Sequence, residues 1–405
     1  MMVFDRIGEK ACWMAFYEYK KEQINTDKAY LEDLLGFIEG EGYLPFADAL
    51  KAGRTLCPPK KILINKTAAG RKRTVYTYPK EEAYILSMIA YLLKEYDHIF
   101  APNLYSFRKY KMAKTAFKDL MKCPGLSQKY VYRSDISAYF NSVNVHKLLP
   151  KLKEVLVEDL PLWEFFRDTL TDDRVLFQGE IISENKGIIP GASISSFLAN
   201  LYLSELDYYF YRNRIYYIRY SDDILVLADT EEELGQYVAV IHEVLAELDL
   251  GINPDKEHIY APGDKWEFLG FCYRNGAVDI SEVSLKKIKD KLRRKTGALK
   301  RWVDKKNIPG TYGAKALVKR FNSKFYDNPV HNELTWALWY FPIINTTASL
   351  QVIDRYEVDC IRYLATGKHT KKRYDFTYAD VKNLGFRSLV HEYYKWKESG
   401  TVGDA

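Results

Sequence analysis

Two adjacent aspartates, Asp222 and Asp223, interrupt an apolar stretch that reads YYIRYSDDILVLA over residues 216–228. Burying an unpaired carboxylate costs several kcal/mol, so a cation should accompany the pair. A third aspartate, Asp135, ends the alternating stretch KYVYRSD, 87 residues earlier. If the two strands are neighbours in one sheet, the three carboxylates meet at its edge and can bind hard divalent cations such as Mg²⁺. Taken alone, Asp222-Asp223 could equally be an ordinary hairpin turn, where Asp is common.

The surrounding pattern predicts an α+β fold, because strands and amphipathic helices alternate along the chain. The N-terminal part is expected to form helices over 1–52 and 81–121, with a basic hairpin around Ala69-Gly70 between them, and then a strand that ends at Asp135. A helix over 143–175 follows, and a loop after Gly187 enters a long apolar helix. The rest is expected to form a hairpin that turns at Ser221-Asp222-Asp223, another helix, two short strands (HIYAPG and WEFLGFCY), and helices from Ser281 onward.

Composition excludes several classes of protein. The chain has 405 residues, of which 47% are hydrophobic, enough to bury two or three packed subdomains. No stretch of about 18 apolar residues exists, and the N-terminus lacks an apolar signal core, so we expect a cytoplasmic protein with no membrane contact. Its five cysteines are scattered and never form a CxxC pair, which argues against disulfides or a zinc site.

Positive charge is concentrated in three stretches. Residues 281–324 contain 15 Lys or Arg and three acids, a local charge of +12, although the whole chain carries only +6. Residues 60–80 add seven basic residues and no acid, and residues 105–118 add five and none. Such stretches on a neutral to acidic body predict a polyanionic partner that is contacted at several places. Each stretch by itself could also be a solvated surface.

Five segments, taken in order, resemble the palm of a reverse transcriptase: RSDISAYFNSV, GIIPGASISSFLANLYL, YSDD, LGINPDKEHI and WEFLGFCY. Upstream, INKTAAGRKRTVY and NLYSFR resemble the fingers motifs of the bacterial group II intron lineage. The YxDD motif alone would be weak evidence for this family, but seven segments in the family's order are specific for it. The resemblance runs from about Lys60 to Tyr273 and implies a right-hand polymerase fold. It places N-terminal helices and fingers in 1–130, the palm in 131–280 with fingers elements in 151–186, and a helical thumb with a C-terminal extension in 281–405.

The resemblance also implies roles for the aspartates. Asp135 and Asp222 match metal-binding aspartates of the family, the Ile136 carbonyl is an expected additional ligand, and Asp223 is the neighbouring carboxylate that shapes the site. The implied cofactor is a pair of Mg²⁺ ions, for which Mn²⁺ could substitute. The implied reaction is attack by a primer 3′-hydroxyl on the α-phosphate of a nucleotide.

Five residues are implied to contact the nucleotide: Lys66, Arg73, Phe140, Gly191 and Lys256. Lys66 and Arg73 match fingers residues that cover the triphosphate, with Arg71 and Lys72 as nearby alternatives. Phe140 matches the aromatic that excludes a 2′-hydroxyl by bulk, although a shift of one residue would select Tyr139. Lys256 corresponds to a lysine proposed to protonate the leaving pyrophosphate, and a surface lysine at a turn is an equal alternative.

One position departs from the family. Most members read PQG in the loop before the long palm helix, where this chain reads Ile189-Pro190-Gly191. Proline supplies neither a side-chain amide nor a backbone donor, so fidelity or template use should differ. Ser193 or Ser195 could provide the missing polar contact, and Gly191 retains the close backbone approach.

The implied partners are an RNA template, a DNA or RNA primer and dNTPs, with no assignment of oligomeric state. Thumb residues Lys286, Lys287, Arg293, Arg294 and Arg301 are expected to lie along phosphates. Residues 325–395 carry no nuclease motif, and their Tyr-rich helices resemble stand-alone, defence-associated reverse transcriptases of the unknown groups, possibly type 2, which copy a dedicated non-coding RNA. A group II intron maturase, a retron-like enzyme and a non-catalytic RNA-binding scaffold are the alternatives.

The tail is expected to select that RNA by stacking unpaired bases. Its candidate groups are Trp336, Trp339, Tyr363, Lys371, Lys372, Arg373, Tyr374, Arg387, Tyr393 and Tyr394.

Overall fold

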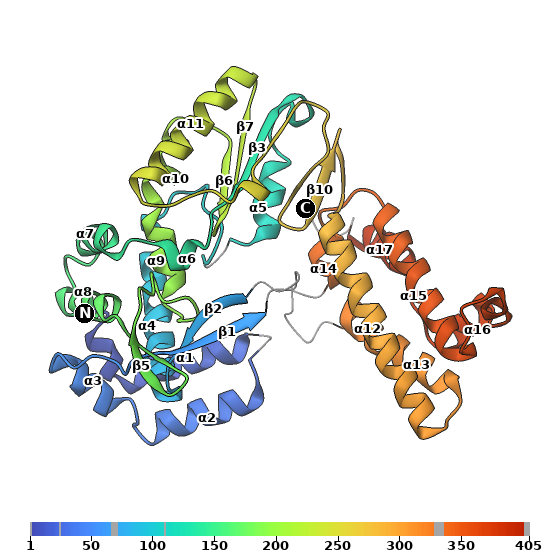
Figure 1. Ribbon diagram of the computed structural model, residues 1–405, viewed down its shortest axis with the longest axis horizontal. Coiled ribbons are helices and arrows are strands. Elements are labelled where there is room, and N and C mark those ends of the chain that lie inside the picture. The colour runs from blue at the N-terminus through green and yellow to red at the C-terminus, as the bar shows by residue number, and fades with distance from the viewer. Residues whose placement is uncertain (1, 24–25, 66–71, 109–110, 328–335, 401–405) are drawn as a thin grey trace. The chain divides into compact units, whose positions relative to one another are not determined.

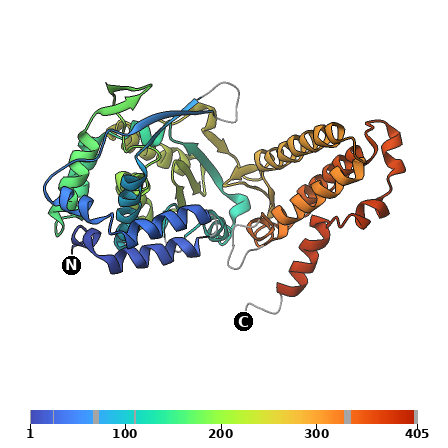
Figure 2. The same ribbon diagram turned by 90° about the horizontal axis from the view of Figure 1, so that it is seen from below.

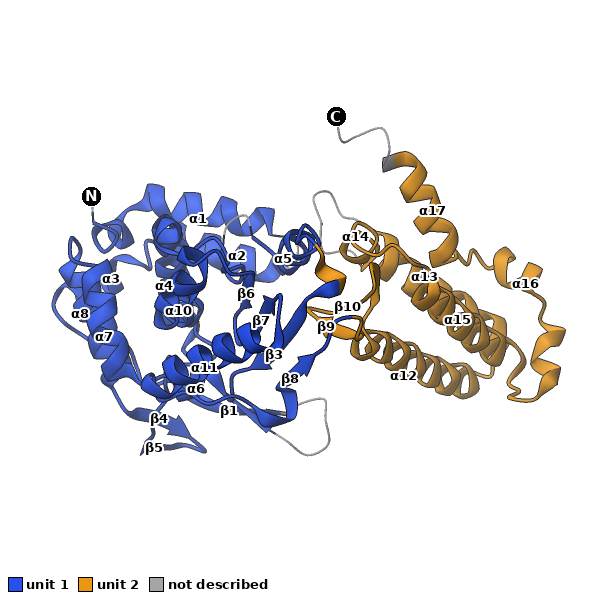
Figure 3. Ribbon diagram, turned by 90° about the horizontal axis from the view of Figure 1, so that it is seen from above, with its two compact units in different colours: residues 1–124, 128–262 blue, residues 125–127, 263–405 orange. Residues whose placement is uncertain are grey.

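The chain, described here from a computed structural model, forms two compact units (Figure 3). Unit 1 comprises residues 1–124 and 128–262, and unit 2 comprises residues 125–127 and 263–405. Over the described residues, no helix combines the length and the apolar character that a membrane span requires. The structure describes residues 2–23, 26–65, 72–108, 111–327 and 336–400.

A four-stranded antiparallel sheet in unit 1 carries the predicted aspartates (Figure 1). Its order is β6-β7-β3-β8, and β3 pairs with β7 so that Asp135 lies opposite Asp223. The predicted neighbourhood of the two strands is therefore confirmed. The strands are β3 (Tyr130–Asp135), β6 (Tyr217–Tyr220), β7 (Asp223–Ala228) and β8 (His258–Tyr260).

The sheet forms because its central strands are apolar on both faces. Ile224 and Leu225, which point to opposite faces of β7, are completely buried, as is Tyr132 of β3. Helices α10 (Ser204–Arg212) and α11 (Glu231–Glu247) pack against the sheet. α11 begins at a capping box, in which Thr230 accepts from the Glu233 backbone and the Glu233 side chain accepts in return, as this sequence pattern predicts.

A second sheet contains the predicted basic hairpin. β1 (Lys60–Asn65) and β2 (Lys72–Thr77) pair antiparallel, while the expected turn at Ala69-Gly70 lies outside the described residues. β4 (Arg174–Phe177) joins β1 in parallel and turns back into β5 (Glu180–Ser183). The region predicted as helix over 143–175 instead contains two helices, α7 (Val145–Val155) and α8 (Leu160–Thr171), and neither β4 nor β5 was predicted. Strands of only four residues are too short to show a clear alternating period.

Helices complete unit 1, and most bury one face in a single hydrophobic core that also includes Tyr132, Phe210 and Ile241. Besides α10 and α11, they are η1 (Asp5–Gly8), α1 (Lys10–Glu22), α2 (Lys28–Glu39), α3 (Leu44–Lys51), α4 (Lys80–Leu92), η2 (Leu93–Ile99), α5 (Ala113–Leu120), α6 (Tyr139–Ser142), α7 (Val145–Val155), α8 (Leu160–Thr171), α9 (Ser195–Tyr202) and η4 (Pro254–Lys256), with η3 (Leu126–Gln128) at the unit boundary.

Unit 2 combines a three-stranded antiparallel sheet, of order β11-β10-β9, with long helices. The single strand expected in WEFLGFCY is two strands, because Leu269 and Gly270 form a turn with positive φ. α12 buries Ile288, Leu292 and Leu299 on one stripe, and it packs against α13 and α15 (Figures 1 and 2). The elements are β9 (Trp266–Phe268), β10 (Phe271–Arg274), β11 (Ala277–Ile280), α12 (Glu282–Lys306), α13 (Gly310–Tyr326), α14 (Trp336–Tyr340), α15 (Ala348–Thr366), η5 (Lys371–Asp375), α16 (Tyr378–Asn383) and α17 (Leu389–Gly400).

Candidate active site

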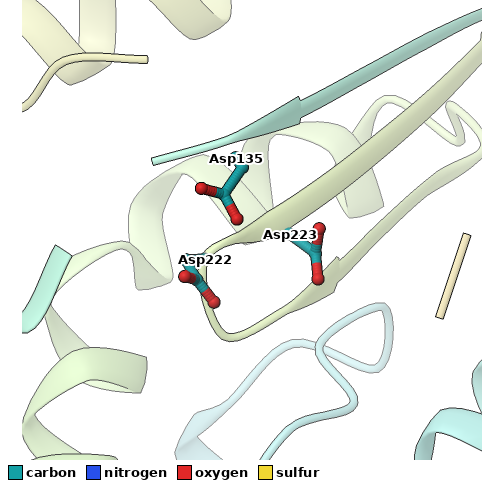
Figure 4. Close-up of side chains that lie close together, drawn as sticks. All are labelled: Asp135, Asp222 and Asp223. Atoms are coloured by element: carbon teal, nitrogen blue, oxygen red, sulfur yellow. The ribbon is translucent and has the colours of Figure 1, made fainter. Parts of the chain in front are cut away.

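Three carboxylates converge at one end of the unit 1 sheet (Figure 4). Asp135 is the last residue of β3, Asp222 lies in the turn between β6 and β7, and Asp223 begins β7. One carboxylate oxygen from each residue lies within 4.8 Å of the other two. Asp135 is buried, and the other two aspartates are partly buried. The predicted convergence is confirmed, and it places only oxygen ligands together.

The β6–β7 turn is held in a strained shape. Tyr220 pairs with Asp223, so the turn contains two residues, Ser221 and Asp222, instead of the three predicted. Ser221 has φ +61°, a conformation that two-residue hairpins require but that usually selects glycine. The Ser221 N–H donates to Ser106 Oγ at 2.8 Å, and the Asp222 carbonyl accepts from the Ile136 N–H at 3.1 Å. These bonds fix Asp222 beside β3.

The Ile136 carbonyl faces the same turn. The Ile136 N–H donates toward the Asp222 carbonyl, and the N–H and C=O of one extended residue point to the same side of its strand. On the opposite side, the Asn253 N–H donates to the Asp135 carbonyl at 2.8 Å. Ile136 is thus oriented as the predicted additional ligand requires, and its role stays a prediction.

A buried ion pair fixes the strand that leads into the turn. Asp207 of α10 and Arg219 of β6 are both fully buried, and Arg219 Nη2 and Nε lie 2.5 and 2.8 Å from the two Asp207 carboxylate oxygens. Arg219 Nη1 also donates to the Ser221 carbonyl at 3.2 Å. Sequence reasoning missed this pair. Its available signals were an arginine inside the apolar strand YIRY and an aspartate on an apolar helix.

The carboxylate cluster is electrostatically unfavourable. Burial and the charge of Asp135 both raise the pKa of Asp222. Burial raises the pKa of Asp223 to about 6, despite the opposing attraction of Arg133, whose Nη2 lies 3.5 Å away. Lys256 Nζ lies 2.7 Å from Asp135 Oδ1, but its side chain is 52% exposed. Among the described residues, Lys256 and Arg133 are the cations beside the three carboxylates, and a cluster so placed fits a hard divalent metal.

The structure separates the two aromatic candidates that follow Asp135. Tyr139 is 2% exposed and its hydroxyl donates to the Ala199 carbonyl at 2.6 Å. Phe140 is partly exposed, so it has a free surface that Tyr139 lacks. Gly187 approaches this segment so closely that a Cβ would lie 2.3 Å from the Phe140 carbonyl oxygen. Sequence reasoning did not identify that requirement for glycine.

The loop with Ile189, Pro190 and Gly191, where the sequence differs from the family motif, contacts β2 through its backbone. The Pro190 carbonyl accepts from the Tyr76 N–H at 2.7 Å, and a Cβ on Gly191 (φ +107°) would lie 2.6 Å from the Tyr76 carbonyl oxygen. The close approach expected of Gly191 is confirmed. Of the two serine alternatives, Ser195 is buried with its hydroxyl donated to the Ile189 carbonyl, whereas Ser193 is exposed and bonds Ser87.

The remaining predicted residues lie on separate elements. Arg73 is exposed on β2, whereas Lys66 and the alternative Arg71 lie outside the described residues. In unit 2, α12 turns all its candidate phosphate contacts outward, opposite its buried stripe. These exposed residues are Lys286, Lys287, Arg293, Arg294 and Arg301.

Comparison with known proteins identifies the family to which this segment is similar. A family described as reverse transcriptase (RNA-dependent DNA polymerase) matches residues 64–273, just over half of the chain, and this range includes all three carboxylates. Among curated proteins, none matches the chain.

Solved structures of telomerases are also similar. Apo telomerase from Candida tropicalis, truncated from its C-terminal domain, is 13% identical with a TM-score of 0.44, over 57% of this chain and 58% of that one. Telomerase from Candida albicans in complex with a TWJ fragment of telomeric RNA is 10% identical with a TM-score of 0.47, over 82% and 64%. The chain spans about three fifths of the length of these two proteins.

Proposed function

The chain belongs to the reverse transcriptase family of RNA-dependent DNA polymerases, which are nucleotidyltransferases, and we propose that Asp135, Asp222 and Asp223 are its catalytic residues. The fold is the right-hand polymerase fold, with fingers, palm and a helical thumb. In this proposal the N-terminal helices and fingers occupy 1–130, the palm is 131–280 with further fingers elements in 151–186, and the thumb with its C-terminal extension is 281–405. The observation that carries the proposal is the convergence of the three carboxylates within the matched segment.

The three carboxylates and the Ile136 carbonyl would hold two Mg²⁺ ions. When bound, such ions lower the pKa of a primer 3′-hydroxyl and neutralise the charge of the triphosphate and pyrophosphate. The contribution of the chain itself is to hold the carboxylate ligands in position. The Asp207–Arg219 pair and the Ser106–Ser221 bond fix the turn before substrate arrives, so the ligands need little reorganisation.

Nucleotide selection would come from the elements around the cluster. Phe140 would lie beneath the sugar and exclude a ribonucleotide by bulk, while exposed Arg73, with Lys66, would cover the triphosphate. Lys256 already contacts Asp135 Oδ1 at 2.7 Å. Its half-exposed chain is long enough to leave that carboxylate when metal binds and to donate a proton to the departing pyrophosphate.

The exposed basic face of α12 suits a template-primer duplex, because Lys and Arg side chains bind phosphates without reading sequence. The template would be a dedicated RNA selected by the unit 2 tail. There, Tyr374 and Tyr378 are 50% and 44% exposed, and Arg362 and Arg373 lie 4.9 and 5.0 Å from the Tyr374 ring. Exposed aromatic rings beside guanidinium groups are the usual platforms for unpaired RNA bases.

Two other aromatic residues of the tail, Trp336 and Tyr393, are packing residues, whereas Tyr394 is 51% exposed. Trp336 contacts the rings of Phe325 and Tyr340, and Tyr393 is 3% exposed with its hydroxyl donated to the Ile344 carbonyl. RNA selection is therefore assigned to the exposed rings of Tyr374, Tyr378 and Tyr394, with Arg362 and Arg373 beside Tyr374.

We further propose a bacterial, group II intron-like origin and a role in defence against phage. The ordered palm and fingers motifs and the Tyr-rich tail support this placement. A flanking intron or retron RNA gene would favour the alternative enzymes instead. The non-catalytic scaffold is disfavoured, because retaining three mutually repelling carboxylates is costly without a bound cation.

Primer extension tests the catalytic proposal. Purified chain should extend a primer on RNA with dNTPs and Mg²⁺, and the Asp222→Ala/Asp223→Ala variant should be slower by at least about a thousandfold, since several kcal/mol of charge stabilisation disappear. Undiminished synthesis by a well-folded double variant would refute the assignment. Phage challenge of cells carrying either form tests the defence role.

Sequencing the copurified RNA tests the dedicated template. Removing the chain after Lys324 would strip α15 from α12 and α13, so point variants are sharper. We expect one enriched transcript with the native chain and its loss in Tyr374→Ala/Tyr378→Ala, but not in Tyr312→Ala, a 60% exposed tyrosine on α13. An unselective RNA population bound by all three would contradict a dedicated template.

A further inference from the structure

Phe107 is a strained and exposed aromatic residue next to the proposed sugar gate. Its φ is +58°, in the left-handed region that bulky residues rarely adopt. Its side chain is 49% exposed, so burial does not explain the strain. Such conformations persist only where the surrounding structure enforces them, and they concentrate at functional sites.

The same backbone feature recurs on the segments around the carboxylates. Eleven non-glycine residues of the described chain have positive φ, and four of them are Phe107, Ala138, Ile189 and Ser221. Ala138 lies between Asp135 and the gate, Ile189 is in the loop fastened to β2, and Ser221 is in the catalytic turn. Strain is therefore shared by the segments that build this site.

Both neighbours of Phe107 are anchored. Ser106 is fully buried; its hydroxyl accepts from the Ser221 N–H at 2.8 Å and donates to Asn200 Oδ1 at 3.2 Å. On the other side, Arg108 Nε and Nη2 lie 2.9 and 3.0 Å from the two Asp97 carboxylate oxygens. The backbone of Phe107 cannot relax, and Ser106 ties it directly to the catalytic turn.

The Phe107 ring contacts the gate. Its centroid lies 6.3 Å from that of Phe140 at an interplanar angle of 86°, the edge-to-face geometry that aromatic pairs prefer. Phe107 also lines a cavity of about 320 Å³ with Phe16, Lys20 and Ser193. With solvent and a cavity beside it, the ring is not an essential part of the hydrophobic core.

We propose that Phe107 positions Phe140 and thereby sets the selectivity of the enzyme for deoxyribonucleotides. This inference rests on the proposed function. The Phe107 ring blocks rotation of the Phe140 ring away from the nucleotide sugar, so the bulk that excludes a 2′-hydroxyl stays in place. Ser106 keeps this support in register with Asp222, because it bonds the backbone of the catalytic turn. Phe107 is a positioning residue, since it acts through Phe140.

The test is the ratio of kcat/KM for a dNTP to that for the matching NTP, measured with the full chain on one RNA template-primer. Phe107→Ala should lower this ratio about three- to tenfold, the value of one edge-to-face contact. Phe107→Tyr should retain it, because the ring edge remains. Phe140→Ala should lower it further, and adding Phe107→Ala to that variant should change nothing, since the supported ring is gone.

Stability measurements separate this role from a structural one. Phe107→Gly relieves the positive φ, so its Tm should equal or exceed that of the native chain while selectivity is lost. A lower Tm together with unchanged selectivity would assign Phe107 to packing and overturn the proposal.

The remaining outcomes separate a failure of this inference from a failure of the proposed function on which it rests. If Phe140→Ala loses selectivity and Phe107→Ala does not, or if the two effects add, Phe107 does not support the gate and the function stands. Equal rises in KM for both nucleotides would assign Phe107 to base stacking and also overturn the proposal. If the native chain makes no DNA, or Phe140→Ala leaves the ratio unchanged, the function or the gate fails and the inference fails with it.

Discussion

Two of the places where unit 1 buries carboxylates balance the negative charge in opposite ways. Asp207 is fully buried, yet both of its oxygens are used, by Arg219 and by the Tyr217 hydroxyl. Within the part of the chain that the structure describes, the cluster of Asp135, Asp222 and Asp223 meets an exposed Lys256 and a more distant Arg133. Asp207, which belongs to the scaffold, has its own cation inside the fold. Carboxylates whose neighbouring cations are weakly held remain open to a metal ion.

The largest predicted effect on stability concerns the buried Asp207–Arg219 ion pair. Arg219→Ala leaves Asp207 buried without its cation, which should lower the free energy of unfolding by about 3–5 kcal/mol. Urea denaturation measures the loss. Arg212→Ala, which removes an exposed arginine of the neighbouring helix, is the matched control and should cost less than about 1 kcal/mol. Equal stability of the two variants would contradict the claim that buried Asp207 depends on Arg219 as its cation.

A smaller change in the free energy of unfolding, of opposite sign, is expected for the cluster of Asp135, Asp222 and Asp223. Folded Asp223 keeps its proton up to a pKa of about 6, against an ordinary 3.8. Between these values the folded state binds more protons than the unfolded state, so metal-free stability falls as pH rises through the window. Asp223→Asn removes that loss and should stabilise the metal-free protein at pH 7.5 by about 1–3 kcal/mol.

Thermal unfolding between pH 4 and pH 8 checks this prediction. Glu232→Gln, a substitution of an exposed acid on α11, serves as the control and should follow the native pH profile. A destabilised Asp223→Asn protein, or one with the native pH profile, would mean that the cluster carries no stored repulsion.

The smallest effect concerns Lys256. Lys256→Met removes a half-exposed partner of Asp135, so it should cost less than about 1 kcal/mol in metal-free protein. The loss should shrink when Mg²⁺ is added, because the metal then supplies the positive charge. A loss as large as that of Arg219→Ala would place Lys256 in the scaffold.

The contrast also explains which features the sequence could predict. The strands around Asp135 and Asp223 are apolar runs with local signals, and the basic α12 follows an apolar period of three to four residues, so both could be located. β4 and β5 are only four residues long, and the parallel pairing of β1 with β4 joins strands distant in sequence, so local periodicity reports neither feature.

The support of the candidate site was equally hidden. Ser106, Asn200 and Arg219 meet around the turn only after three separate segments have folded together. Each residue is unremarkable in its own stretch of sequence, and only Arg219, a charge inside an apolar strand, gave a signal. The carboxylates could be predicted because their chemistry restricts residue type, whereas many residue types can form supporting hydrogen bonds.

Binding of Mn²⁺, followed by electron paramagnetic resonance, tests most directly whether the cluster is open to metal. At pH 7.5 the native chain should bind Mn²⁺ in competition with Mg²⁺, and binding should weaken below about pH 6 as Asp223 takes up its proton. The Asp222→Asn/Asp223→Asn variant, folded and at least as stable, should lose this binding. Equal Mn²⁺ affinity in the native chain and the variant would contradict the account.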